Sequence, residues 1–339
     1  MGAFLSCEFV RQESVDVWSF GFKAMQPQSE QAFDPGRFVM IDFPDVQGNS
    51  GTRCYSISGA TAPDTFEISV RRKGDGGVSD NLVRRLQPGA LVNLVDVAGQ
   101  ITSRQLAGNC TVLMLAAGIG VTVPIALVRD IAKQHLAGVA APKVRLVIVT
   151  PVLECLPFLT ELLSLSLTAS WFELSVRLTR QAVVSGHSCF AAGRPTAEEV
   201  FGGSSWDSVV ICGGLAFADF FQAQARNRLP HCTLFVEAFS AAEAPQPLGG
   251  ANAVAVKIGT ETVVIDSAKN LLTALEEQGV SIQHQCRAGI CGRCRIKVVG
   301  GDYRSNAQLA LSDKERQQGY VLACCTFATG AGISIETAG

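Results

Sequence analysis

The sequence predicts three domains of different fold class: an antiparallel β-barrel over residues 1–105, an α/β domain over residues 106–240 and a small α+β domain over residues 251–339. Short segments separated by Gly, Pro and Asp predict the barrel. Apolar runs that alternate with longer helical segments predict a parallel sheet with helices on both faces. Residues 241–250, rich in Ala, Pro and Gly, are typical of a linker.

The barrel prediction depends on short strands that end at turn residues. Strand-like segments cover residues 38–43, 54–58, 65–70 and 90–95. Many short strands joined by turns are typical of an antiparallel barrel or sandwich. One helix interrupts them at residues 79–86, after Gly76-Gly77, and Ser79 is its candidate N-cap.

The remaining two domains follow from a change of pattern along the chain. In the α/β domain, strand-like runs cover residues 111–115, 144–149, 209–211 and 234–236, and helical segments cover residues 125–135, 158–165 and 217–225. After the linker, strands are expected at residues 254–258, 261–265 and 295–299, with a helix at residues 269–278. A hairpin, a helix and further strands are enough for a small α+β domain.

Composition excludes some classes of partner. A net charge of −2 and a pI near 6.1 give no indication of a nucleic-acid or anionic-membrane partner. The apolar run from Val112 to Val128 is short for a membrane span and contains Gly118, Gly120 and Pro124. Most of the 12 cysteines are scattered without a disulfide framework, which fits a reducing compartment, so we expect a cytoplasmic protein without structural disulfides.

Near the C-terminus, four cysteines have the spacing of a metal centre. Cys286, Cys291 and Cys294 form a C-x4-C-x2-C run, and Cys324 follows after 29 further residues. This is the plant-type [2Fe–2S] spacing, in which three thiolates converge from one tight loop. Gly289 fits such a loop because glycine adopts positive φ without strain. Structural zinc usually has paired C-x2-C elements, so the iron–sulfur cluster is the favoured interpretation.

The fourth ligand has two candidates, since Cys325 follows Cys324 directly. If both residues lie on a strand, alternation sends their thiols to opposite faces, and only one of them can face the cluster.

A second group of residues in the barrel predicts a site for a phosphorylated aromatic ligand. Arg53 offers a fork of donors for phosphate, Tyr55 a flat ring and Ser56 a hydroxyl donor. Arg53 and Tyr55 share one face of the expected strand. An edge strand with a packed Tyr is the alternative interpretation. Residues 76–79, at a helix start, supply backbone N–H groups for a second phosphate contact.

Five motifs, in this order, resemble the ferredoxin–NADP reductase-like superfamily. They are Arg53-x-Tyr55-Ser56, Gly76-Gly77-x-Ser79, Leu115-Ala-Ala-Gly118-Ile-Gly120-Val-Thr122, Ile211-Cys212-Gly213-Gly214 and Val236-Glu237-Ala-Phe239. With a C-terminal ferredoxin domain, which the resemblance implies is a β-grasp fold, the chain resembles the flavin, nicotinamide and [2Fe–2S] reductases that supply Rieske oxygenases, di-iron oxygenases and hybrid-cluster proteins.

The resemblance implies a role for each matched residue. Arg53 binds flavin phosphate, Tyr55 stacks on the isoalloxazine and Ser56 bonds near its reactive edge. The phosphate or pyrophosphate contacts come from Gly76, Gly77, Val78 and Ser79. The nicotinamide dinucleotide lies on Gly118, Gly120 and Thr122, beside Cys212 and Gly213. Glu237 and Phe239 line the far side of the flavin, and Cys324, in a Leu-Ala-Cys sequence, is the fourth cluster ligand.

Two departures from the family pattern fall in the nicotinamide half. The family usually has Gly-x-Gly-x-Thr-Pro, whereas here Val123 separates Thr122 from Pro124, and Gly214 stands where Pro is common. NADPH would need a base near the end of the second strand, and residues 151–158 contain none, so NADH is expected. NADPH stays open because Arg177, Arg180 and Arg194 could approach from other loops. FAD is expected, with FMN as the alternative.

These expectations combine into one function. Hydride passes from NADH to the flavin as an electron pair, and electrons leave singly through the cluster. Four dispersed histidines cannot supply both a Rieske centre and a mononuclear iron site, so oxidation occurs on a partner, a terminal oxygenase or another redox metalloprotein. One alternative is a reductase of a hybrid-cluster or di-iron protein. Another is an electron-carrier or redox-sensing module without nicotinamide turnover.

Overall fold

The computed structural model describes residues 3–26, 33–99, 101–184, 186, 188–203, 205–239, 253–284, 287, 289, 292–305, 310–311 and 313–337. The chain divides into two compact units, Met1–Glu237 and Ala238–Gly339. The first unit holds both the barrel and the parallel sheet. The expected boundary at residue 105 falls inside the 3-10 turn η1 (Ser103–Leu106), and the expected linker, residues 241–250, lies outside the described residues.

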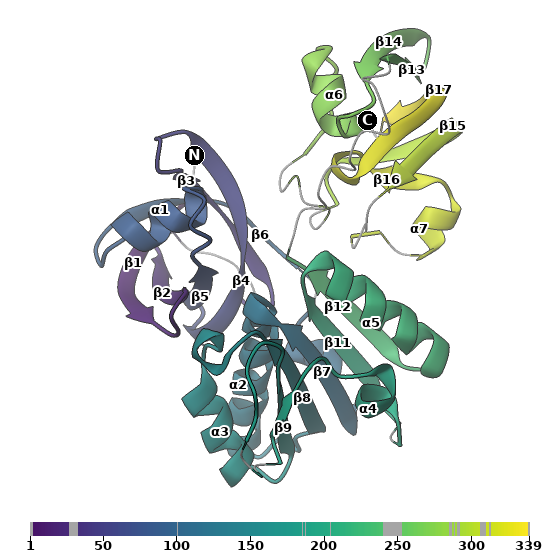
Figure 1. The fold of residues 1–339 in the computed structure, drawn as a ribbon. Helices are drawn as coiled ribbons and strands as arrows, with labels where there is room; N and C mark the ends of the chain where they lie inside the picture. Colours follow the sequence, from purple (N-terminus) through teal and green to yellow (C-terminus); the bar gives the residue numbers. More distant parts are fainter. Residues whose placement is uncertain are drawn as a thin grey trace. The chain divides into compact units, whose positions relative to one another are not determined.

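Six antiparallel strands close the barrel in the order β1-β2-β5-β4-β3-β6 (Figure 1). Their bounds are β1 Ala3–Gln12, β2 Val17–Ala24, β3 Phe38–Pro44, β4 Ser50–Ala62, β5 Thr65–Arg71 and β6 Leu91–Ala98. Alternation places Tyr55 and Ile57 of β4 in the apolar barrel core, while Ser56 and Ser58 are buried on the opposite face. β4 is therefore covered on both sides.

The helix of the barrel, α1 (Val78–Arg85), begins one residue before its expected start. Its N-cap is Gly77, with no side-chain cap hydrogen bond, so the expectation that Ser79 caps the helix is wrong. Because Gly77 is extended at ψ −175°, the helical turn already includes Ser79 as its second residue.

The second half of the first unit is a six-stranded sheet in the order β10-β9-β8-β7-β11-β12, and the pairs from β10 to β11 are parallel. Its strands are β7 Thr111–Ala117, β8 Lys143–Thr150, β9 Phe172–Leu178, β10 Phe190–Ala192, β11 Ser208–Gly213 and β12 Thr233–Ala238. Its helical segments are η2 Gly118–Val121, α2 Thr122–Leu136, η3 Leu153–Cys155, α3 Leu159–Thr168, α4 Ala197–Phe201 and α5 Leu215–Arg228.

The order of these strands defines where a ligand can bind. The chain leaves β7 for β8 on one side, and later returns to place β11 on the other side. Right-handed crossovers then put α2 and α3 on one face of the sheet and α5 on the other, as Figure 1 shows. The reversal between β7 and β11 is a topological switch point, and its crevice lies at the carboxyl ends of these strands.

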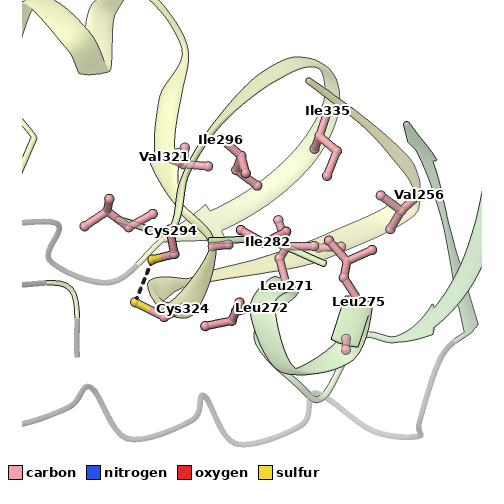
Figure 2. Packing of buried hydrophobic residues seen from close by; sticks show 14 of the residues in the cluster. Val256, Leu271, Leu272, Leu275, Ile282, Cys294, Ile296, Val321, Cys324 and Ile335 are labelled. Carbon is pink, nitrogen blue, oxygen red and sulfur yellow. Dashed lines mark hydrogen bonds between the residues drawn. The ribbon is translucent and has the colours of Figure 1, made fainter. Parts of the chain in front are cut away.

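The second unit is a five-stranded mixed sheet, β14-β13-β17-β15-β16, with a short helix packed on it. Its elements are β13 Ala253–Ile258, β14 Glu261–Asp266, α6 Leu271–Glu277, β15 Arg295–Ser305, α7 Asp313–Gln317, β16 Tyr320–Leu322, η4 Ala323–Cys325 and β17 Thr326–Thr337. Leu271 and Leu275 of α6 pack on Val256, Ile296 and Ile335 of the sheet (Figure 2). This small apolar core places Cys294 and Cys324 at its rim.

A membrane-spanning helix would need a long apolar segment. Among the described residues, no helix has both the length and the hydropathy to cross a bilayer.

Candidate functional site

The turn after β7 packs directly against the end of β11. A Cβ added to Gly120 would lie 2.3 Å from the carbonyl oxygen of Cys212 and 2.9 Å from Cα of Gly213. Gly118 has φ +54°, and a Cβ there would meet only Arg71 Nη1, at 3.8 Å. Glycine at residue 120 thus permits close packing, while the backbone at Gly118 stays open to a ligand. This geometry at a switch point fits the pyrophosphate of a dinucleotide.

The altered Thr122-Val123-Pro124 sequence is accommodated in the first turn of α2. Pro124 is the third residue of the helix, where a backbone N–H has no partner within the helix. The hydroxyl of Thr122 donates to the carbonyl of Ile119 at 3.0 Å and is buried. The hydroxyl of Thr122 therefore closes the preceding 3-10 turn.

The structure brings together three of the expected site residues at the junction of barrel and sheet. The hydroxyl of Ser56 on β4 donates to Oε1 of Glu237 on β12 at 2.8 Å, and both residues are buried. Cys212, at the end of β11, is fully buried and contacts the backbone of Glu237. Phe239 follows β12 by one residue and is half-buried.

Burial controls the protonation of this group. It raises the pKa of Glu237 to about 7, although the hydrogen bond from Ser56 acts in the opposite direction. Burial, together with the charge of Glu237, also raises the pKa of the Cys212 thiol well above its usual value. Near neutral pH the site therefore contains a neutral thiol and a carboxyl group that can hold a proton.

A second group of expected residues lies at the start of α1. The Tyr55 hydroxyl and the Ser79 hydroxyl lie 3.0 Å apart, and burial raises the pKa of Tyr55. The guanidinium of Arg53 is exposed and bonds the carbonyl of Thr52 at 2.9 Å. A Cβ at Gly51 would lie 3.4 Å from Arg53 Nη1 and 3.2 Å from a methyl of Val78. Arg53 therefore lies beside the helix N-terminus, as a phosphate-binding group would.

Asp80, which our sequence analysis missed, organises this loop. Its buried carboxylate accepts the backbone N–H groups of Lys73 at 2.8 Å, Gly74 at 3.0 Å and Gly76 at 2.7 Å. Burial acts to raise the pKa of Asp80, but these three bonds outweigh it and lower the pKa. The N–H of Gly76 is thus engaged within the loop, and the N–H of Gly77 donates to Asp75 at 3.0 Å.

The described part of this site fits a phosphorylated aromatic cofactor. A cation, a helix N-terminus and two hydroxyls converge from β4 and α1. The side chain of Asn81 donates to the carbonyls of Pro44 and Asp45, both at 3.0 Å, and its buried Oδ1 has no partner among the described residues. An orphaned buried acceptor beside the helix start is consistent with a hydroxyl-bearing ligand.

Two expected cluster ligands, Cys294 and Cys324, are buried with their Sγ atoms 3.2 Å apart (Figure 2). The backbone bond from the N–H of Ala323 to the carbonyl of Cys294 joins their segments at 2.9 Å. Gly289 and Gly292 have φ +75° and +74°, a backbone conformation that favours glycine at both positions. Cys286 and Cys291 lie outside the described residues. Among the residues that are described, no group of three or more His, Cys, Asp or Glu could hold a metal ion.

The expectation that Cys324 and Cys325 point to opposite faces is wrong. Both lie in the 3-10 turn η4, where successive side chains do not alternate. Their Sγ atoms are 3.7 Å apart, and both thiols are buried. Both thiols therefore lie near the expected iron–sulfur site. Of the two, Cys324 is the one that contacts Cys294.

Single substitutions should separate these two cysteines. We expect Cys324→Ser to lose the visible absorption and most of the iron of the cluster, because a hydroxyl is a poor substitute for thiolate. Cys325→Ser should keep the visible absorption and the iron, since Cys325 is expected to lie beside the cluster ligands without being one of them. Iron analysis and absorption spectra check this, and iron loss in Cys325→Ser alone would exchange the two roles.

The close approach at Gly120 also gives an expected result. Gly120→Ala should destabilise the first unit by about 1–3 kcal/mol, because the new methyl group collides with the backbone of β11. Gly186→Ala is the matched control, since a Cβ there meets no atom of the described residues within 4 Å. Urea unfolding followed by tryptophan fluorescence checks the difference, and equal midpoints for the two variants would contradict it.

Two family models match the chain. Residues 6–102 match the oxidoreductase FAD-binding domain, and residues 256–329 match the 2Fe-2S iron-sulfur cluster binding domain. The first covers the barrel, and the second covers β13 to β17 with the cysteine loop.

Curated relatives are similar over nearly their full lengths. The chain is 29% identical to NADH oxidoreductase HCR of Escherichia coli (strain K12) over 319 residues, which are 93% of this chain and 92% of that protein. It is 24% identical to the ferredoxin reductase component of 3-ketosteroid-9-alpha-monooxygenase from Rhodococcus rhodochrous, over 94% of this chain and 92% of that protein.

Solved structures share the fold. Phthalate dioxygenase reductase, described as a modular structure for electron transfer from pyridine nucleotides to [2Fe-2S], aligns with TM-score 0.60 and 16% identity over 98% of this chain and 97% of its own. An intact type IV self-sufficient cytochrome P450 monooxygenase aligns with TM-score 0.70 and 19% identity over 98% of this chain, which covers 41% of that longer protein.

Fold, motifs and family matches together define an electron-transfer oxidoreductase that contains a flavin domain and an iron–sulfur domain. Over nearly its whole length the chain is similar to an NADH oxidoreductase and to reductase components of monooxygenases, and it contains an oxidoreductase FAD-binding domain and a C-terminal 2Fe-2S iron-sulfur cluster binding domain. The predicted fold class is confirmed, as are FAD and a [2Fe–2S] cluster as cofactors.

Proposed function

We propose that this protein is the reductase component of a multicomponent oxygenase, taking electrons from NADH and delivering them to a separate, Rieske-type terminal oxygenase. When bound, the FAD accepts a hydride and the [2Fe–2S] cluster conducts electrons one at a time. The single observation that carries the proposal is the group of Ser56, Cys212 and Glu237 at the switch point of a chain that also has a ferredoxin domain.

The chain's own residues have distinct roles in this proposal. Ser56 and Glu237 form a buried hydrogen-bonded pair that can hold a proton at the Glu237 carboxyl beside the reacting rings. The Cys212 thiol is fully buried and stays neutral, so it would place no charge beside a bound nicotinamide. Arg53 and the start of α1 orient the flavin phosphates, and Asp80 holds the loop before α1 in place.

The charges near the nucleotide favour NADH over NADPH. Residues 151–158, after β8, contain no base. Arg177 is paired with Glu199 at 2.7 Å, which leaves it less able to bind a 2′-phosphate. Arg180 and Arg194 are exposed and would have to supply that contact for NADPH.

Anaerobic stopped-flow mixing tests the proposal. NADH should bleach the flavin band of the oxidised protein at a saturating rate, and NADPH should do so with a much higher apparent dissociation constant. Bleaching of the cluster band should follow. If neither nucleotide reduces the flavin, the protein is an electron carrier or redox-sensing module, and the reductase proposal fails.

A second candidate function is reduction of a hybrid-cluster or di-iron protein. The observation that favours it is the 29% identity to an NADH oxidoreductase HCR, which exceeds the 24% identity to the monooxygenase component. NADH-dependent turnover reconstituted with a purified Rieske oxygenase, a di-iron oxygenase and a hybrid-cluster protein separates the candidates. The partner that gives turnover at the lowest concentration identifies the function.

A further inference from the structure

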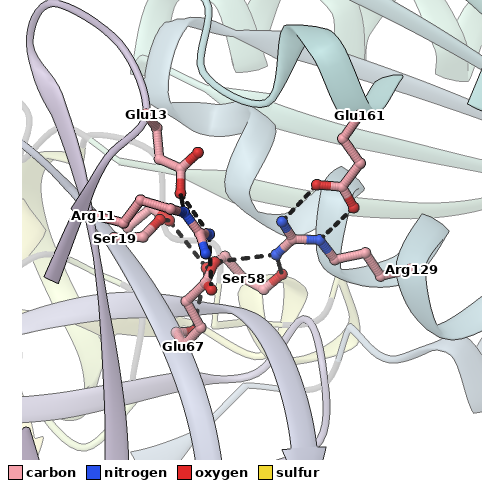
Figure 3. Close-up of polar contacts among 8 residues, drawn as sticks. Arg11, Glu13, Ser19, Ser58, Glu67, Arg129 and Glu161 are labelled. Carbon is pink, nitrogen blue, oxygen red and sulfur yellow. Dashed lines mark hydrogen bonds and ion pairs between the residues drawn. The ribbon is translucent and has the colours of Figure 1, made fainter. Parts of the chain in front are cut away.

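Arg129, in the middle of α2, joins the two halves of the first unit. Toward the barrel, its Nη1 donates to the carbonyl of Ser58 at 2.9 Å and to Oε1 of Glu67 at 3.1 Å. Toward α3, its Nε and Nη2 donate to the two carboxylate oxygens of Glu161, each at 2.7 Å. Figure 3 shows the guanidinium between the two carboxylates. One planar fork thus bonds three groups on three elements.

The charges around Arg129 form a continuous chain. Glu67 also accepts from Arg11 at 3.1 Å, and Arg11 pairs with Glu13 at 2.6 Å (Figure 3). The side chains of Arg129 and Glu67 are 24% and 14% exposed, so water screens their attraction only in part. Burial alone would lower the pKa of Arg129, but Glu161 and Glu67 outweigh it and raise the pKa. Removal of Arg129 would leave the Glu67 carboxylate with the half-exposed Arg11 and the Ser58 hydroxyl as its described side-chain partners.

The backbone on both sides is adapted to this guanidinium. Phe158 places its ring 5.0 Å from Arg129 Cζ, and does so from a left-handed backbone with φ +62°, which is rare for a bulky residue. On β4, a Cβ at Gly59 would lie 3.1 Å from Arg129 Nη1. Glycine at residue 59 therefore leaves the space that the guanidinium occupies.

A second contact joins the same strand to a different element. Ser56, two residues before Ser58 on β4, bonds Glu237 of β12 at 2.8 Å. The contact with Arg129 is made by the backbone carbonyl of Ser58, and the contact with Glu237 by the side chain of Ser56, so β4 meets the sheet half through both its backbone and a side chain. Together the two contacts join β4 to α2 and to β12.

We propose that Arg129 is a positioning residue for hydride transfer, which presupposes the reductase function proposed above. It holds the sheet half against β4, so that the nucleotide turn and the Ser56–Glu237 pair keep a fixed spacing. The groups that it bonds, Ser58, Glu67 and Glu161, are outside the expected cofactor set. Its effect on the reaction is therefore transmitted through the packing of the two halves.

Hydrogen–deuterium exchange of the complete holoprotein tests the contact itself. Arg129→Ala should increase amide exchange at residues 56–60 and 125–132, with the β1–β2 pairing unchanged. Arg145→Ala is the matched control, because Arg145 pairs with Glu173 at 3.2 Å between two strands of the sheet and contacts no barrel residue through that pair. Equal exchange in the wild type and Arg129→Ala would overturn the proposal.

Stopped-flow flavin reduction tests the positioning role. At saturating NADH, Arg129→Ala should reduce the flavin about 10- to 100-fold more slowly, the usual cost of a small misplacement of reacting groups. Its FAD content and its apparent dissociation constant for NADH should be unchanged. A purely structural role would lower the unfolding midpoint and leave this saturating rate unaltered, and that outcome would also overturn the proposal.

Gly59→Ala provides a second variant that keeps every charge. It should displace the guanidinium by a few tenths of an ångström and slow reduction in the same direction, by less than Arg129→Ala. If Arg129→Ala does not fold, Gly59→Ala tests the positioning role of Arg129 in its place. A flavin-reduction rate equal to that of the wild type in Gly59→Ala would then overturn that role. If the wild type is not reduced by either nucleotide, the reductase function fails, while the exchange experiment still decides whether Arg129 joins the halves.

Discussion

Cys294→Ser is expected to abolish electron transfer to a one-electron protein acceptor while NADH still reduces the flavin. Cys294 is buried, and its sulfur lies 3.2 Å from that of Cys324, so the substitution removes one of the two expected cluster ligands that the structure describes. The barrel and the sheet belong to the other compact unit, so we expect flavin reduction to continue without this centre. NADH-dependent reduction of cytochrome c should fall to the level of iron-free protein, and reduction of ferricyanide by the flavin should continue.

A cysteine elsewhere provides the control for this result. Cys110 is exposed at the start of β7, so Cys110→Ser should retain both activities and the full iron content. Equal loss of cytochrome c and ferricyanide reduction in Cys294→Ser, with folding confirmed by circular dichroism, would contradict a modular arrangement of the two redox centres.

Glu237→Gln is expected to remove a pH dependence of stability. Burial raises the pKa of Glu237 to about 7 from its ordinary value of 4.5. Between these pH values the folded protein keeps a proton that the unfolded chain releases, so stability is greatest below pH 4.5, falls as pH rises and levels off above about 7. A shift of this size corresponds to about 3 kcal/mol. Glutamine keeps the acceptor for Ser56 and has no charge to bury.

Urea unfolding at pH 5 and pH 8 checks this expectation, and the tryptophans report on the correct unit. Trp18, Trp171 and Trp206 all lie within Met1–Glu237. The wild type should lose stability between the two pH values, and Glu237→Gln should lose about 3 kcal/mol less. Glu173→Gln, at an exposed surface carboxylate, should behave as the wild type. Parallel losses in all three proteins would show that Glu237 is ionised in the folded state.

Local chain geometry made the fold class and the glycine motifs predictable. The repeat of short strands between turn residues gave the barrel, and apolar runs between helical segments gave the parallel sheet. Gly118 and Gly120 could be identified because a strand followed by a tight turn and a helix needs residues without Cβ. These features depend on neighbours within a few residues, so a single sequence contains the information.

Contacts between distant residues were not predictable in this way. Ser56 and Glu237 are 181 residues apart, and nothing in the residue types predicted that they form a hydrogen-bonded pair. Arg129 is not part of a sequence motif. Its partners come from β4, β5 and α3, which are far from it in the sequence. An arginine four residues after a buried residue such as Ile125 is common in helices and predicts no function. The role of Arg129 depends on which carboxylates the fold brings near it.

Details of single turns also escaped the sequence. Cys324 and Cys325 follow a strand, and nothing in their residue types distinguishes a strand that continues from a 3-10 turn. Asp80 is inside a helix, where an acidic residue in the first turn is expected for the helix dipole. Its three bonds to the preceding loop depend on the path of residues 73–76, which only the folded backbone defines.

The polar outer face of β4 has a consequence for synthesis on the ribosome. All six barrel strands have been made once residue 98 is complete, whereas α2 and β12, which cover that face, end at residues 136 and 238. During this interval the uncovered face presents the hydroxyls of Ser56 and Ser58, which water can hydrate, instead of an apolar surface that would attract other nascent chains. The face of β4 that later joins the two halves is thus polar and not apolar while the sheet half is still being made.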